Sequence, residues 1–62
     1  MNSLIPSDRA RIAEVVRQAC VAAALEAHEH AGISGLCQEG RWEAAIEAVR
    51  SLDVKTVLLQ LD

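Results

Sequence analysis

The stretch at residues 39–52 reads EGRWEAAIEAVRSL, and the rest of the chain is organised around it. Four apolar side chains recur here at the i, i+3, i+4 and i+7 spacing of one α-helical face: Trp42, Ala45, Ile46 and Val49. Trp42 is also the only aromatic residue of the chain. The pattern predicts a helix that docks on a preceding one, with Trp42, Ile46 and Val49 holding the hairpin together.

Upstream, residues 8–31 keep one helical phase and contain no helix breaker. Ser7 is the predicted N-cap, because its hydroxyl can accept from the free amides of the first turn. Residues 1–6 are then expected to be an arm, since Pro6 terminates or precedes helices. A helix over residues 8–31 is about 36 Å long at ~1.5 Å per residue. It is too long for a core of this size, so it must project or pair.

Two interpretations stay open between Gly32 and Gly40. In the first, Gly32 is a left-handed C-cap and Ser34 caps a short second helix; in the second, the long helix continues to Glu39. Periodicity favours continuity, whereas glycines inside a helix cost roughly 1 kcal/mol each relative to alanine. Both interpretations place a stop at Gly40 and begin the docking helix near Arg41.

The C-terminal segment shows one further helical pattern. Asp53 is a candidate N-cap, and apolar residues recur at helical spacing over residues 54–61. The predicted fold is therefore all-α and a single domain over residues 1–62. It comprises a long N-terminal helix, an antiparallel docking helix and a short C-terminal helix.

The chain is too short to build a large hydrophobic core. A chain of 62 residues buries only about 60% of the surface that its unfolded form exposes, so a lone core is marginal. Cys20 and Cys37 are too few for a disulfide scaffold, and no signal peptide precedes them. We expect buried free thiols in a reducing cytoplasm. Association with another copy of the chain is then the remaining way to compensate for the marginal core.

The middle of the long helix indicates where association would occur. Residues 20–25, CVAAAL, are apolar around the whole circumference, and such a helix needs neighbours on more than one side. We therefore expect a homo-oligomer, with an unknown protein as a further possible partner. Four residues of the long helix are predicted to meet the second chain: Val16, Cys20, Ala23 and Ala27.

Charge and hydropathy argue against two other kinds of partner. Nine acidic and six basic residues give a net charge of −3, and the basic residues are dispersed among acids. No patch for phosphate results, so we expect no nucleic-acid binding. The longest apolar run, residues 19–25, is far short of the ~20 residues that span a membrane. The sequence predicts a soluble protein without a membrane partner.

Potential metal ligands gather at residues 26–30, EAHEH. Glu26 and His30, at i and i+4, share a helix face, but zinc requires four ligands and His28 points nearly opposite to His30. Cys37 or a second chain would have to complete a site. We predict no metal, no cofactor and no catalytic residue, and keep a metal- or thiol-dependent regulator as the alternative function.

Three short segments resemble known families. Residues 39–47 resemble the turn and second-helix start of a tetratricopeptide repeat, which implies a helix pair and, in such repeats, peptide binding. Residues 31–34 resemble the turn of a DNA-binding helix-turn-helix, which makes nucleic-acid binding the second alternative. Residues 31–43 are similar to stretches in short helical bacterial proteins loosely labelled acetyltransferase, although 62 helical residues offer no sheet or loop to hold coenzyme A. The sequence favours a small interaction or assembly module that is not an enzyme.

Overall fold

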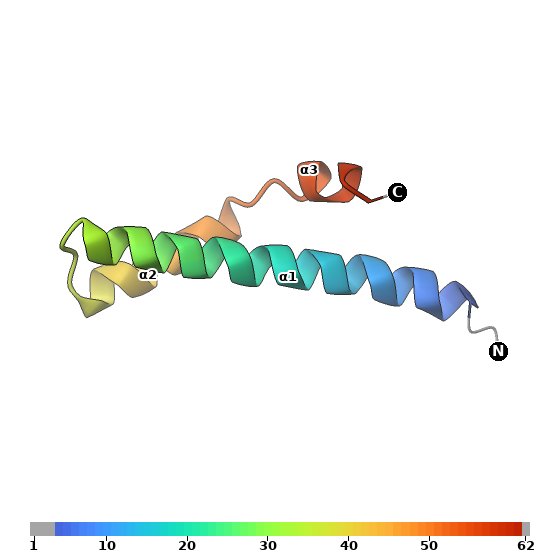
Figure 1. Cartoon of the computed structure of the whole chain (residues 1–62), viewed down its shortest axis with the longest axis horizontal. Coiled ribbons are helices and arrows are strands. Elements are labelled where there is room, and N and C mark those ends of the chain that lie inside the picture. The colour runs from blue at the N-terminus through green and yellow to red at the C-terminus, as the bar shows by residue number, and fades with distance from the viewer. Residues whose placement is uncertain (1–3, 62) are drawn as a thin grey trace.

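The computed structural model describes residues 4–61, which form three α-helices (Figure 1). Helix α1 spans Leu4–Ile33, α2 spans Gln38–Arg50 and α3 spans Val54–Leu59. Helix α2 folds back antiparallel along the C-terminal half of α1, and α3 lies beside α1 nearer its N-terminus. The molecule is elongated, with extents of 50 × 20 × 15 Å. The predicted fold class and order of helices are confirmed.

The first helix begins earlier than the sequence predicted. It starts at Leu4, so Pro6 is its third residue and Ser7 lies inside it instead of capping it. Proline is tolerated there because the first amides of a helix have no intrahelical acceptor. Residues 4–6 of the expected arm are thus helical, and residues 1–3 lie outside the described part of the chain.

A glycine in the left-handed conformation ends α1, but it is Gly35 (φ +88°) and not Gly32. The Gly35 amide donates to the Gly32 carbonyl at 3.0 Å, and the Leu36 amide donates to the Ala31 carbonyl at 2.9 Å. These two bonds are the Schellman pattern, which satisfies carbonyls at the end of a helix. Both earlier interpretations were wrong: α1 stops neither at Gly32 nor at Glu39.

Helix α2 contains Gly40 in its first turn, so the predicted stop at Gly40 is also wrong. A Cβ at Gly40 would lie 3.3 Å from the Cβ of Leu36, so the missing side chain lets Leu36 approach the helix closely. At the next residue, the Nε–H of Arg41 donates to the Leu36 carbonyl at 3.1 Å. The same guanidinium lies over Gly32, where a Cβ would be 3.2 Å from the Arg41 Cζ. Arg41 therefore ties α2 to the turn.

The last helix is capped as predicted. The carboxylate of Asp53 accepts the Thr56 amide at 3.3 Å and the Thr56 hydroxyl at 2.8 Å. Helix α3 ends at Leu59, two residues before the predicted end. Val57 is buried and attaches α3 to α1, which is the only helix that α3 contacts within residues 4–61.

The core of this fold is small. Within residues 8–61, only three apolar side chains are buried: Ala31, Ala45 and Val57. Ala45, which is 3% exposed, is the residue that α2 turns to α1. Trp42 is 63% exposed, so its expected packing on the preceding helix is not what closes the hairpin. The small methyl side chain of Ala45 lets the backbones of α1 and α2 approach closely, so the two helices pack along the Ala45 side of α2.

Candidate interaction surfaces

A groove runs along one side of the hairpin between α1 and α2. Its walls contain Ala23, Ala27 and Ala31 from α1 and Ala44 and Ala48 from α2, and these five residues define the alanine groove. The remaining lining comes from Glu26, His30, Ser34 and Leu36. The groove has a volume of about 520 Å³ and is open to solvent along its length.

The alanine groove follows from the spacing of small residues on both helices. Ala23, Ala27 and Ala31 are four residues apart, as are Ala44 and Ala48, so each set lines one side of its helix. Where two helices meet through alanine, no long side chain fills the angle between them. The result is a channel with methyl walls, of the kind that a third helix fills in a bundle.

Glu26 and His30, the pair considered as metal ligands, both line the alanine groove. Across residues 4–61, no group of three or more His, Cys, Asp or Glu side chains is close enough to hold a metal ion. Cys20 is half-buried and Cys37 is exposed, and both thiols are free. The expectation of burial therefore fails for Cys37, which lies in the turn at the start of α2.

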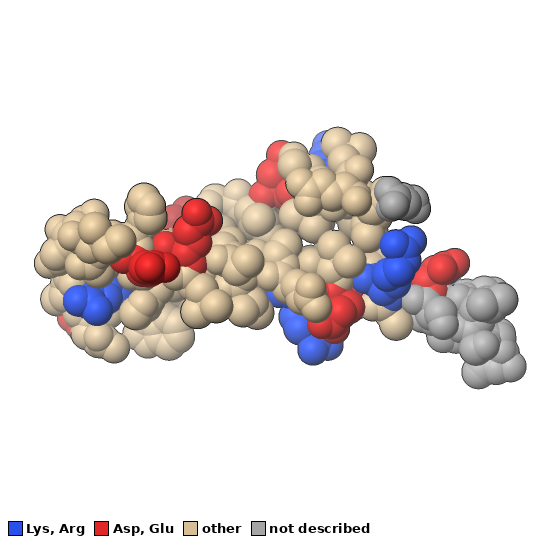
Figure 2. Space-filling view, viewed as in Figure 1, with Lys and Arg blue, Asp and Glu red and all other residues tan. Residues whose placement is uncertain are grey.

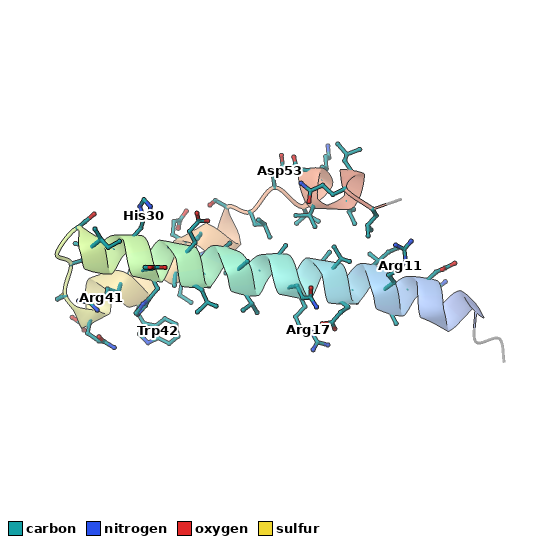
Figure 3. The ribbon with its side chains drawn as sticks, viewed as in Figure 1. Arg11, Arg17, His30, Arg41, Trp42 and Asp53 are labelled. Atoms are coloured by element: carbon teal, nitrogen blue, oxygen red, sulfur yellow. The ribbon has the colours of Figure 1, made fainter. Side chains whose placement is uncertain are left out.

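A second surface surrounds Trp42 on the other side of α2. It consists of Glu39, Trp42, Glu43, Ile46, Glu47 and Arg50, and is called the Trp42 surface below. Trp42 is 63% and Ile46 48% exposed. Ala44 and Ala48 lie nearly opposite Trp42 and Ile46 around the helix, so the two surfaces are separate. In Figure 3, Trp42 and His30 point to opposite sides of α1.

The Trp42 surface carries acidic groups that are only partly compensated. Arg50 lies 3.8 Å from Glu47, from guanidinium nitrogen to carboxylate oxygen. Glu39 and Glu43 form no ion pair with any residue of the described chain. Elsewhere, charged side chains are scattered in small groups of mixed sign over the face seen in Figure 2. The surface therefore combines the chain's one aromatic ring with two unpaired carboxylates.

The α1 residues predicted to meet a second chain are neither fully buried nor fully exposed. Val16, Cys20, Ala23 and Ala27 are all half-buried. Ala23 and Ala27 line the alanine groove, which brings them together with α2. Val49 is 36% exposed and lies on the same side of α2 as Trp42. Of the predicted interface residues, Ala23 and Ala27 thus lie at the groove, and Trp42, Ile46 and Val49 lie on the other side of α2.

Ala44 and Ala48 were not among the residues singled out from the sequence. A signal for them existed, because small residues four apart mark a helix face that another helix can approach closely. The stronger period of Trp42, Ile46 and Val49 obscured it.

Within residues 4–61, no helix has the length and apolar character needed to cross a membrane. No family model, curated protein or solved structure matches this chain. The resemblance of residues 39–47 to a tetratricopeptide helix pair therefore stays a resemblance.

Proposed function

We propose that this protein is a small self-associating helical module whose role is assembly, with no catalytic step of its own. The observation that carries the proposal is its exposed area. A compact monomer of 6.7 kDa has an accessible surface of about 3,900 Å². This chain exposes 4937 Å². The excess of about 1,000 Å² is close to the ~800 Å² that each partner buries in a standard protein interface.

The alanine groove is the part of that surface best suited to a second copy. Its methyl walls let another helix approach to an interaxial distance of about 8–10 Å. The approach removes apolar surface from water and orders few side-chain torsions, because alanine has no rotamers to lose. A two-fold dimer, in which each copy supplies a helix to the other's groove, is the simplest closed arrangement.

The exposed apolar side chains support the same proposal. Within residues 8–61, eleven large apolar residues are exposed, among them Val21 at 51% and Leu25 at 65% in the middle of α1. Scattered exposed apolar residues are ordinary in folded proteins. It is unusual that only three apolar residues are buried within the part of the chain that the structure describes. The proposal keeps the expected cytoplasmic location, which the two free cysteines support.

Sedimentation equilibrium over a range of protein concentrations tests the proposal. We expect the apparent mass to rise from 6.7 kDa toward twice that value. Ala23→Glu places a carboxylate in the alanine groove and should shift the protein to the monomer. The matched control is Ala22→Glu, which adds the same charge at the neighbouring, exposed position.

Circular dichroism of each variant shows whether the helices are retained. The Ala44→Glu variant repeats the test from α2, should Ala23→Glu disturb α1. A wild-type protein that keeps the mass of one chain up to millimolar concentration contradicts the proposal. Equal dissociation of the Ala22→Glu and Ala23→Glu proteins contradicts the placement of the interface in the groove.

A further inference from the structure

We propose that the Trp42 surface is a docking site for a cationic amphipathic helix of a different protein. This surface lies across α2 from the alanine groove, so the inference does not depend on self-association. Three observations carry it: an exposed aromatic ring, an adjoining apolar side chain, and carboxylates that lack partners within the described chain.

The apolar part of the surface supplies an anchor. Trp42 and Ile46 are one helical turn apart and leave 63% and 48% of their area in water. Tryptophan is the residue type most enriched among the energetic centres of protein interfaces, because its large rigid ring buries much area at a small entropic cost. The surface has a volume of about 630 Å³, lined by six residues of one helix. Its shape is a shallow shelf, which suits a helix lying across it better than a small molecule.

The charges select the kind of helix. Glu39 and Glu43 are also one turn apart, on the flank of the same shelf, and no described basic side chain lies within ion-pairing distance of either. Glu47 is held by Arg50 at 3.8 Å. A partner helix with its apolar face on Trp42 and Ile46 could place lysine or arginine side chains on these two carboxylates. An arginine near the ring would add a cation–π contact.

The same charges disfavour other occupants. Phosphate groups of a nucleic acid or an anionic membrane surface would be repelled by the two free carboxylates. A second copy of the chain offers a poor match, because its basic residues are interspersed with acids. Arg17, for example, is paired with Glu14 at 3.3 Å on the same helix. We therefore assign the surface to a partner with a distinctly basic helix.

Because Trp42 is the only tryptophan, its fluorescence reports directly on this surface. The probe is a synthetic helical peptide of leucine and lysine, about as long as α2 and free of aromatic residues. We expect saturable binding with a blue shift of Trp42 emission and reduced quenching by acrylamide. A peptide with glutamate in place of lysine should cause neither change.

Two charge variants make the test local. Glu39→Gln combined with Glu43→Gln should weaken binding of the lysine peptide about tenfold at low salt. The matched control, Asp8→Asn combined with Glu29→Gln, changes the net charge equally at exposed positions outside both surfaces. It should leave the affinity within about twofold.

Three results would overturn the inference. One is an unchanged Trp42 emission with the lysine peptide. Another is equal weakening by both charge variants, which would mean that only net charge attracts the peptide. The last is a blue shift produced by raising the protein concentration alone, which would assign the surface to a second copy. Repeating the titration with the Ala23→Glu protein separates this outcome from the groove, since peptide binding should persist in that variant.

Discussion

The most direct test of the fold is to replace Gly35 by alanine. Gly35 has a φ of +88°, a conformation that costs an L-residue roughly 1–2 kcal/mol. A Cβ at this position would meet no atom within 4 Å, so the whole effect is conformational. Alanine also restricts the unfolded chain, which offsets about 0.4–1 kcal/mol of that cost. We expect a net loss of about 1 kcal/mol, or a fall in Tm of ~4–8 °C for a domain of this size.

The matched control is Gly32→Ala, at the glycine that one of the two sequence interpretations assigned as the left-handed cap. Gly32 lies inside α1, where alanine gains up to about 1 kcal/mol in helix propensity. Its Cβ would press on the Arg41 guanidinium at 3.2 Å. The flexible Arg41 side chain can move away, but it then loses its hydrogen bond to the Leu36 carbonyl, which contributes about 0.5–1.5 kcal/mol. The two effects nearly cancel, so the Tm should hardly change.

Thermal unfolding followed by circular dichroism at 222 nm measures both variants. All samples need one protein concentration, because association shifts the apparent stability. A third protein, made by chemical synthesis with D-alanine at position 35, should be at least as stable as the wild type, since a D-residue favours positive φ. A Gly35→Ala protein that melts like the wild type, or a Gly32→Ala protein that is the less stable of the two, would refute the assignment of the turn.

Three further predictions concern the contacts that hold α2 and α3. Val57→Ala removes two buried methylene equivalents and should cost about 1.5 kcal/mol of α3 docking, seen as faster amide exchange over residues 54–59 with α2 unaffected. The Thr56 hydroxyl and amide lower the pKa of Asp53 below its usual value of 3.8, so the cap stabilises α3 above that pH and its contribution is lost as the pH falls through the lowered pKa. The amide resonance of Thr56 should follow this titration in the wild type and lose it in Asp53→Asn. Ala45→Leu forces a larger side chain between α1 and α2 and should cost about 1–3 kcal/mol in urea unfolding, whereas Ala44→Leu, in the open groove, should cost less.

Local sequence signals determined the elements of this protein. A 3.6-residue apolar period marks each of the three helices because a helix must place its apolar residues on one side whatever it later packs against. The Asp53 cap was equally predictable, since it involves only Asp53 and Thr56, three residues apart. Element boundaries followed less well. Pro6 suggested a later start for α1 than the observed Leu4, because proline is compatible with both the outside and the first turn of a helix.

Tertiary structure alone decided the turn and the surfaces. The sequence contains three glycines, and any of them could have adopted the left-handed conformation. The path of α2 back along α1 decided that Gly35 has the positive φ and that Leu36 packs against Gly40. The period around Trp42 predicted the apolar side of α2 and placed Trp42 at the contact with α1, but a period alone cannot decide which residues of that side face α1. Close approach of two backbones favours a methyl group over an indole, so Ala45 became buried and Trp42 stayed in water. A periodic pattern describes one helix, whereas burial depends on the distance between two.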